Sequence, residues 1–389
     1  MTTRRTMLAG MAATAGGILL PAGFGARAAT QASSEELART PLKDIARRKG
    51  MTFGTAVAVN PTQYGNPAYR ALVERECNII VAENEMKWQY IEPAEGKLNF
   101  GGGDTLLKWA TEKNIELRGH NMFWAPEKWL PVWLTKKDFG AKPAQAVEQL
   151  TRAHVKAMAD HFGKAVRSWD VVNEAVEPET GLLRDNSLNK HTGKLEHLDL
   201  TFRAAREFAP HAQLVYNDYM RGDAGSAKHR AGVLKMLEDL KKRGTPVDAV
   251  GLQSHIGSWD ETDKGRDDLV QWRKFLDELT AMGYDLLITE FDVNDRRLPA
   301  DIAKRDAGVA ALTKDYLDLT LSYPNLHDFL LWGMTDDVSW LQTWYEAPRL
   351  DKLPMRPLPY DGKGNAKPMR AAIAAAIEAA PVRKPKKKA

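Results

Sequence analysis

The 389-residue sequence predicts an α/β protein, a (β/α)8 TIM barrel in a single domain. Short apolar runs alternate with longer amphipathic stretches eight times along the chain, and each run ends in polar or aromatic side chains. Strands that alternate with helices imply right-handed crossovers and a parallel sheet. A barrel of this kind needs about 250 residues, so the chain has room for enlarged loops.

The expected strands are short apolar runs bounded by polar residues, which is the pattern of strands buried on both faces. They lie near Phe53–Val59, Asn78–Val81, Ile115–Leu117, Val166–Val172, Gln213–Tyr216, Ala249–Leu252, Asp285–Thr289 and Asp328–Leu331. Between them, apolar residues three to five positions apart predict amphipathic helices, most clearly over 147–162, 233–240 and 269–279.

The residues after each run distinguish a closed barrel from the alternative, a doubly wound open sheet. In chain order they are Asn60, Glu83-Asn84, His120-Asn121, Asn173-Glu174, Asn217-Asp218, Gln253 with His255, Glu290 with Asp292, and Trp332 leading to Thr335-Asp336-Asp337. A barrel gathers all such endings at its carboxyl end, where barrel enzymes place their chemistry, whereas an open sheet gathers only those at its switch point. A solvated loop is the better explanation for any single ending, but eight in order favour the barrel.

The chain begins with features of an export peptide. Residues 1–28 contain Arg4-Arg5, a glycine-rich apolar run over 7–20 and a small-x-small cleavage signal at 26–28. The paired arginines indicate the twin-arginine type, and the run is too short for a membrane anchor. We therefore expect an exported protein, periplasmic or secreted. A linker over 29–41, a catalytic domain over 42–380 and a basic disordered tail over 381–389 complete the expected organisation.

The composition is that of an ordinary globular protein, with 43% hydrophobic residues, 27% charged residues and a net charge of +4. Much of the positive charge lies in the leader and tail, so the balance gives no reason to expect nucleic acid. Cys77 is the single cysteine, which excludes an intramolecular disulfide. We expect a monomer without cofactor or metal, and without membrane contact once the leader is removed.

Two glutamates carry the predicted chemistry. Glu174 and Glu290 follow well-separated strands, and glycosidic bond cleavage needs two such carboxyl groups, one acid and one carboxylate. Asn173 is a neutral neighbour that leaves Glu174 free to keep the raised pKa of an acid. Asp292 shares a strand face with Glu290, and His255 between them could order both. Glu290 is therefore the candidate nucleophile.

Tryptophans support a sugar substrate. Eleven are present, and seven are expected on or just after strand ends rather than in helices: Trp88, Trp124, Trp129, Trp133, Trp332, Trp340 and Trp344. Indole rings stack on the apolar faces of sugars. Core packing is the simpler interpretation for Trp109, Trp169 and Trp272, whereas stacking is favoured for Trp332 and Trp340.

Several motifs together resemble glycoside hydrolase family 10, the retaining endo-1,4-β-xylanases built on a (β/α)8 barrel. They run in order from about Leu42 to about Ile377, and comprise Glu83-Asn-Glu-Met-Lys-Trp88 with Glu92-Pro93 and Gly96, Arg118-Gly-His120 with Trp124, Trp169-Asp-Val-Val-Asn-Glu-Ala175, Asn217-Asp-Tyr219, Gly251-Leu-Gln-Ser-His255, Thr289-Glu-Phe-Asp292 and Trp332-Gly-Met-Thr-Asp336 with Ser339-Trp340.

The resemblance implies roles for individual residues. Glu174 would be the acid/base and Glu290 the nucleophile. The sugar at the cleavage point would be held by His120, Trp124, Asn173, Gln253, His255 and Trp332. The next sugar on the non-reducing side would be held by Glu83, Asn84, Lys87 and Trp340. Tyr219 would face the leaving-group side, and the substrate would be xylan or xylo-oligosaccharide.

The chain departs from the family pattern in two places. Where the family usually has a Trp-His pair, this chain has Trp124-Ala125 followed by the tryptophan-rich stretch 126–133. The segment 340–359 carries Trp344, Tyr345 and several prolines that do not align with the family. These changes bear on substrate detail and leave both glutamates in place.

Three alternatives remain open. A sugar-binding barrel without catalysis would keep the tryptophans but usually lose a carboxylate, and both are present. A metal-dependent hydrolase would use His120, His255 and Asp292, but the chain lacks the close histidine spacing of many such sites. The same retaining chemistry on another β-1,4-linked glycan or glycoside is the nearest alternative.

Overall fold

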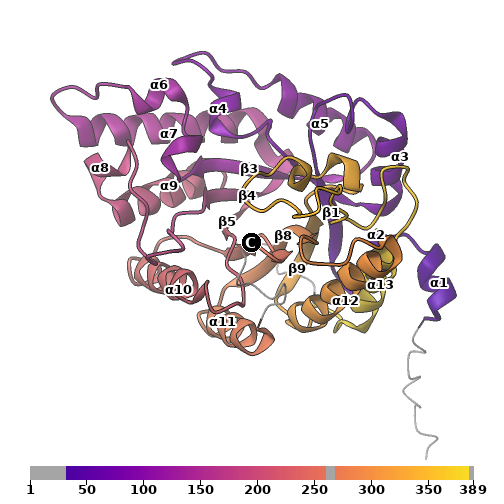
Figure 1. Cartoon of the computed structure of the whole chain (residues 1–389). Helices are drawn as coiled ribbons and strands as arrows, with labels where there is room; N and C mark the ends of the chain where they lie inside the picture. The colour runs from indigo at the N-terminus through magenta and orange to yellow at the C-terminus, as the bar shows by residue number, and fades with distance from the viewer. Residues whose placement is uncertain (1–31, 260–267, 385–389) are drawn as a thin grey trace, which may run out of the picture. The chain divides into compact units, whose positions relative to one another are not determined.

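The computed structural model describes residues 32–259 and 268–384, and within them eight parallel strands close into a barrel. Thr52 pairs with Asp328 to join the first strand to the last, and Ala249 pairs with Asp285 to complete the ring. The strands stand in the middle of Figure 1 with helices around them. The barrel prediction is confirmed, and the open-sheet alternative is wrong.

The observed strands match the apolar runs, with one addition. They are β1 Thr52–Val57, β2 Ile79–Ala82, β3 Glu116–Trp124, β4 Val166–Asn173, β5 Gln213–Asp218, β6 Ala249–Leu252, β7 His255–Gly257, β8 Asp285–Asn294 and β9 Leu326–Leu331. The unexpected β7 prolongs the line of β6 and pairs with the end of β8, where His255 is opposite Asp292. This pairing brings His255 to the carboxyl end of the barrel.

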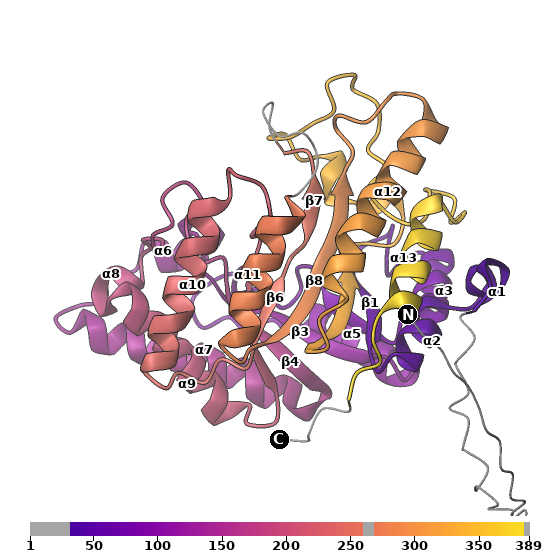
Figure 2. The same ribbon diagram turned by 90° about the horizontal axis from the view of Figure 1, so that it is seen from below.

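Helices cover the outside of the strands, and α10 to α13 lie side by side in Figure 2. The α-helices are α1 Ser34–Arg39, α2 Leu42–Arg48, α3 Pro67–Glu76, α4 Trp88–Ile91, α5 Gly101–Glu112, α6 Val132–Thr135, α7 Pro143–Phe162, α8 Asn189–Thr192, α9 Lys194–Phe208, α10 Ala227–Lys242, α11 Leu269–Ala281, α12 Ile302–Thr320 and α13 Pro368–Ala379. Short 3-10 turns are η1 Glu127–Trp129, η2 Gly163–Ala165, η3 Asp336–Val338 and η4 Trp340–Gln342.

The longest helix, α7, shows how local sequence sets these elements. Pro143 occupies its first turn, where a missing N–H costs nothing. Val147, Val155 and Phe162 lie on its buried face, and the spacing of that face is helical. Gly163 ends the helix at φ 53°, a left-handed conformation that glycine adopts without strain. The predicted 147–162 helix is therefore confirmed.

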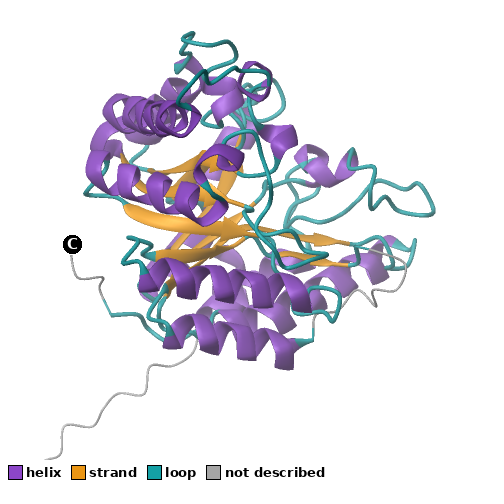
Figure 3. Ribbon diagram, turned by 90° about the vertical axis from the view of Figure 1, so that its left-hand side faces the viewer, coloured by secondary structure: helices purple, strands orange, loops and turns teal. Residues whose placement is uncertain are grey.

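Long connections follow three of the strands and carry most of the irregular structure. They lie between β3 and α7, between β4 and α9, and between β9 and α13. Figure 3 shows long loops gathered toward one end of the strands. Barrel enzymes use this carboxyl end for chemistry, so these loops frame the candidate site.

Three tryptophans predicted to pack in the core are buried there. Trp109, Trp169 and Trp272 are at most 4% exposed. Two others differ from expectation, because Trp88 begins helix α4 and Trp133 lies in helix α6. Trp88 stacks on His154, with ring centres 3.9 Å apart, and is buried, so it supports the wall of the barrel.

The expected linker over 29–41 includes helix α1. Leu37 on this helix accepts a hydrogen bond from Arg370 of α13, and Arg370 also reaches Thr40. The predicted export peptide at 1–28 and the last five residues of the tail lie outside the described residues. Across 32–259 and 268–384, no helix is both long and apolar enough to cross a membrane.

Candidate active site

The two predicted glutamates come from different strands of the barrel, and neighbouring side chains connect them. Glu174 follows β4 directly, and Glu290 lies in β8. The backbone of Glu174 adopts φ 55°, which turns the chain sharply out of the strand. Its N–H donates to the carbonyl of Asn217 at 2.9 Å, and its own carbonyl accepts from Arg184 Nε at 3.1 Å. Both sides of the turn are therefore held by hydrogen bonds.

Side-chain amides connect the two carboxyl groups. Asn217 Nδ2 donates to Glu290 Oε1 at 2.7 Å and to Asn173 Oδ1 at 2.8 Å. On the other side, Gln253 Nε2 donates to Glu174 Oε1 at 3.0 Å. Asn217 was named in a motif but not predicted as a site residue. Its position at the end of an apolar run was the signal that could have identified it.

His255 lies between Glu290 and Asp292, as the sequence suggested. Its Nδ1 is 2.9 Å from Asp292 Oδ1, and its Nε2 is 3.4 Å from Glu290 Oε2. Burial disfavours a charged imidazole, but the two carboxylates outweigh it and raise the pKa of His255 to about 10. At neutral pH the side chain is therefore a cation that faces both carboxylates.

The surroundings shift the two glutamates in opposite directions. Burial raises the pKa of Glu174, and the negative charge of Asp218 raises it further. Burial also acts to raise the pKa of Glu290, but the hydrogen bond from His255 and the charges of His120 and His255 overcome it, so the pKa is lowered. One carboxyl group thus favours its proton and the other favours its charge. This division suits an acid and a nucleophile.

Three residues predicted to bind a sugar beyond the cleavage point lie together near β2. Lys87 Nζ donates to Asn84 Oδ1 at 3.1 Å, and Glu83 Oε2 accepts from Gln63 Nε2 at 2.8 Å. Burial lowers the pKa of Lys87, against the pull of Glu290, Glu83 and Glu174, and burial raises the pKa of Glu83. Gln63 had no sequence signal of its own, because it lies three residues after Asn60, the polar ending of the first run.

His120 is fixed by a buried ion pair that the sequence did not reveal. Its Nδ1 is 2.9 Å from Asp170 Oδ2, and Arg118 Nη2 donates to Asp170 Oδ1 at 2.6 Å. Burial would raise the pKa of Asp170, but the Arg118 charge and the His120 hydrogen bond lower it. The His120 ring meets Trp332 edge to face, at 5.3 Å between centres. Asp170 and Arg118 lie inside strands among apolar residues, and only closure of the barrel brings them together and buries them. Local sequence therefore could not predict this pair.

The aromatic side chains at the site already pack on one another. Trp124 stacks on Trp129 at 4.5 Å between ring centres, and Lys87 Nζ lies 4.6 Å from the centre of the Trp124 ring. Trp340 stacks on Trp259 at 5.8 Å and donates from Nε1 to Asp292 Oδ2 at 2.8 Å. Trp129, from the stretch where the sequence departs from the family pattern, therefore packs on the predicted sugar-binding residue Trp124.

Tyr219 lies beyond the end of β5 on the Glu174 side of the site. Its hydroxyl accepts from Arg184 Nη2 at 2.8 Å, and the same guanidinium holds the Glu174 carbonyl. Arg184 was not predicted, since the connection after β4 carries no periodic pattern. Tyr219 thus shares a support with the candidate acid.

The histidines do not assemble a metal site. In the described part of the chain, no group of three or more His, Cys, Asp or Glu side chains has the arrangement of metal ligands. His120 is paired with Asp170, and His255 is paired with Asp292. Each of these two histidines thus pairs with a different aspartate, and the two pairs do not converge on one point.

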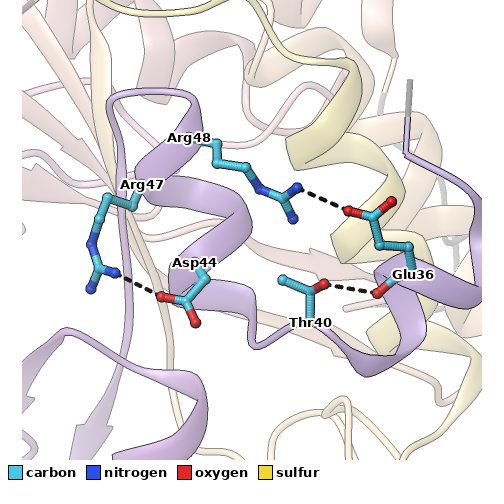
Figure 4. A pocket seen from close by; sticks show the side chains of 5 residues that line it. All are labelled: Glu36, Thr40, Asp44, Arg47 and Arg48. Atoms are coloured by element: carbon cyan, nitrogen blue, oxygen red, sulfur yellow. Dashed lines mark hydrogen bonds and ion pairs between the residues drawn. The ribbon is translucent and has the colours of Figure 1, made fainter. Parts of the chain in front are cut away.

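Figure 4 shows a hollow on helices α1 and α2. Its lining consists of Glu36, Thr40, Asp44, Arg47 and Arg48. The charges pair within it, Arg47 with Asp44 at 2.7 Å and Arg48 with Glu36 at 3.2 Å. These are exposed surface pairs, which contribute little, and they leave no group free for chemistry.

Two carboxyl groups of opposite proton preference, joined by amides at the carboxyl end of a barrel, are the groups that glycosidic bond cleavage requires. A family model described as glycosyl hydrolase family 10 matches residues 41–376. The chain belongs to this family, and the predicted resemblance is confirmed.

Relatives and solved structures similar to this chain agree with this family assignment. The chain is 30% identical to endo-1,4-beta-xylanase A of Caldicellulosiruptor saccharolyticus, over 77% of this chain and 86% of the relative. It is 28% identical to endo-1,4-beta-xylanase C of Paenibacillus barcinonensis over 84% of this chain, and spans about a third (31%) of that longer protein. A crystal structure of xylanase 10B from Thermotoga petrophila with xylobiose superposes with a TM-score of 0.76 at 28% identity, covering 87% of this chain and 97% of that one.

Proposed function

We propose that this protein is an endo-1,4-β-xylanase that cleaves internal β-1,4-xylosidic bonds of xylan with retention of configuration. The observation that carries the proposal is the asymmetry between the two carboxyl groups. Glu290 faces the His255 cation, whereas Glu174 faces side-chain amides and lies beside the charge of Asp218. Family membership and relatives named endo-1,4-beta-xylanase support the substrate class.

The reaction follows from these positions in two steps. Glu290 attacks the anomeric carbon while Glu174 gives its proton to the departing sugar oxygen, which forms a covalent glycosyl-enzyme. Glu174 then takes a proton from the water that attacks the same carbon and releases Glu290. Each step inverts the carbon once, so the product keeps its original configuration. His255, held by Asp292, keeps Glu290 ionised and oriented.

The remaining predicted residues bind the substrate in this proposal. His120, Trp124, Asn173, Gln253, His255 and Trp332 hold the sugar at the cleavage point. Lys87, Asn84 and Glu83 bond the hydroxyls of the next sugar on the non-reducing side, and Trp340 packs beside it. Tyr219 meets the leaving-group side. These contacts extend beyond a single sugar, which favours cleavage inside a chain.

A substrate panel tests the endo assignment. We expect xylan viscosity to fall early and xylo-oligosaccharides of several lengths to appear first, with little activity on β-1,4-glucan or mannan. Release of xylose alone from the start, with a slow fall in viscosity, would show an exo enzyme. Faster cleavage of another β-1,4-glycan would show that xylan is not the preferred substrate, while the reaction type would stay the same.

We also infer that residues 1–28 direct export, on the basis of the paired arginines and the cleavage signal. Sequencing the amino terminus of the exported protein should place the cut after residue 28. Arg4→Lys with Arg5→Lys should strongly reduce export while leaving the enzyme active in lysates. Unchanged export would contradict the twin-arginine type.

A further inference from the structure

Asp218, at the end of β5, is a buried carboxylate that the proposed reaction does not use. It is 0% exposed. It follows Asn217 directly, and Asn217 accepts the backbone hydrogen bond of Glu174 from the adjacent strand. Asp218 therefore stands one residue from the point where β5 holds the candidate acid.

The Asp218 carboxylate accepts hydrogen bonds from two donors. The Tyr216 hydroxyl donates to its Oδ2, and the Tyr219 N–H donates to its Oδ1 at 2.8 Å. The ring nitrogen Nε2 of His229, on α10, lies 3.2 Å from Oδ1 but off the hydrogen-bond direction, so this contact is electrostatic. His229 is 1% exposed, and its ring meets Tyr219 edge to face at 5.1 Å. An ionised carboxylate, which only accepts, satisfies this set of neighbours.

The same group of side chains holds the backbone of Glu174. The Tyr216 hydroxyl that binds Asp218 also accepts from the N–H of Ala175 at 3.2 Å. A single phenol thus connects Asp218 to the residue after Glu174. Because Glu174 adopts a left-handed backbone conformation, its direction depends on such supports.

We propose that Asp218 is a positioning residue for Glu174. Through Tyr216 it anchors the turn on which Glu174 stands, and its fixed negative charge favours the protonated form of Glu174 that the first step requires. This inference rests on the proposed acid/base role of Glu174. It adds a residue from a second strand to the control of proton transfer.

Electrostatics support the geometry, since Asp218 is the largest charge acting to raise the pKa of Glu174 after burial itself. Other charged or titratable groups near this part of the site are Glu290 on β8, Lys87 before α4, Glu177, Glu179 and Arg184 after β4, Tyr216 and Tyr219 on and after β5, and His229 on α10. Replacing Asp218 with Asn removes one charge and leaves all of these in place.

The test is the pH dependence of kcat/KM for Asp218→Asn in the full protein, with an aryl xylobioside whose leaving group needs a proton. We expect the basic limb, which reports Glu174, to move to lower pH while the acid limb stays. Each pH unit of movement costs about tenfold in rate above the limb. An unmoved basic limb in a folded variant overturns the charge role.

A dinitrophenyl xylobioside provides an internal control, because its leaving group departs without a proton. Asp218→Asn should form the glycosyl-enzyme from it at a rate within about threefold of wild type, whereas general acid catalysis is worth about 10²-fold or more with the poor leaving group. An equal loss on both substrates would assign Asp218 a structural role only. Asp199→Asn, which removes a charge from α9, should leave both limbs unchanged.

Tyr216→Phe separates the anchor from the charge and remains informative if Asp218→Asn does not fold. It should slow cleavage of the poor leaving group selectively, and wild-type rates on both substrates would overturn the anchoring role. Glu174→Gln should abolish the basic limb. If the basic limb persists in Glu174→Gln, the proposed role of Glu174 is wrong. If the limb is lost in Glu174→Gln but does not move in Asp218→Asn, only the role of Asp218 is wrong.

Discussion

At the scale of single residues, one type of side chain performs two tasks because its neighbours differ. Glu290 lies beside the His255 cation, whereas Glu174 accepts hydrogen bonds from side-chain amides and lies near the negative charge of Asp218. The pKa of Glu290 is lowered from 4.5 and that of Glu174 is raised from 4.5. Activity needs Glu290 ionised and Glu174 protonated, which defines a window of pH between the two.

The first prediction is the shape of that window. The acid limb of kcat/KM should lie below pH 4.5, because a lowered pKa keeps Glu290 charged until more acid is added. The basic limb should lie above pH 4.5, because a raised pKa keeps Glu174 protonated longer. Rates measured from pH 3 to pH 9 on a short xylo-oligosaccharide give both limbs. A single limb, or a window that lies wholly below pH 4.5, would contradict the assignment.

The second prediction concerns Asp292, which is 0% exposed and accepts from both His255 and Trp340. Asp292→Asn removes the charge that raises the pKa of His255, so the imidazole should lose its proton well below pH 10. We expect kcat/KM to fall by about 10²-fold or more, as when a histidine loses its orienting carboxylate. NMR titration of His255 follows the cause directly. Near-wild-type turnover would remove Asp292 from the mechanism.

The raised pKa of His255 also makes the stability of the fold depend on pH. A histidine with a raised pKa stabilises the fold most below the ordinary pKa of 6.5, and that contribution is lost as pH rises toward about 10. Wild-type protein should therefore lose stability over this range, and Asp292→Asn should lose less. Denaturation at pH 6 and pH 10 compares the two.

At the scale of elements, one buried ion pair joins helices from both ends of the described chain. Glu76 at the end of α3 accepts from the N–H of Leu42 at the start of α2, at 2.8 Å, and from Arg370 of α13 at 3.3 Å. Burial would raise the pKa of Glu76, but these two contacts lower it. Arg370 also donates to the carbonyl of Leu37 on α1. Four helices are thus held at one carboxylate and its partner.

The third prediction follows from breaking this pair. Glu76→Ala leaves Arg370 buried without its carboxylate, so the free energy of unfolding should fall by about 3 kcal/mol or more. Because the pKa of Glu76 is lowered, its contribution is present above pH 4.5 and is lost as pH falls below that value. Urea denaturation at pH 7 and pH 4 measures both effects. The exposed pair of Glu36 with Arg48 is the control, where Glu36→Ala should cost under about 1 kcal/mol.

At the scale of the whole molecule, the apolar runs and their polar endings were enough to predict the barrel and the strand ends at which Glu174 and Glu290 lie. They did not predict the short strand β7, which carries His255. Local pattern could not show which distant side chains meet. Asp170 and Arg118 read as interruptions of apolar strands until barrel closure buried them together. Trp88 and Trp133 lie in helices of four residues, too short for periodicity to reveal. Gln63 and Arg184 come from connections without any repeating pattern.

The departures from the family pattern now have positions in the structure. Ala125 is buried, and Trp129 from the tryptophan-rich stretch stacks on Trp124 beside it. Trp344 and Tyr345 extend the row of rings that begins at Trp259 and Trp340. These rings contact one another and replace neither carboxyl group, so the departures bear on the substrate and not on the reaction type.

Azide rescue of the two glutamate variants tests the assignment of acid and nucleophile most directly. Glu174→Ala should still be glycosylated by aryl xylobiosides with good leaving groups, and azide should then replace the water that lacks a base, giving the β-glycosyl azide. Glu290→Ala cannot form the covalent intermediate, so it should be inactive alone. Azide in the vacated space should give the α-glycosyl azide. If the two products appeared the other way round, Glu174 would be the nucleophile and Glu290 the acid.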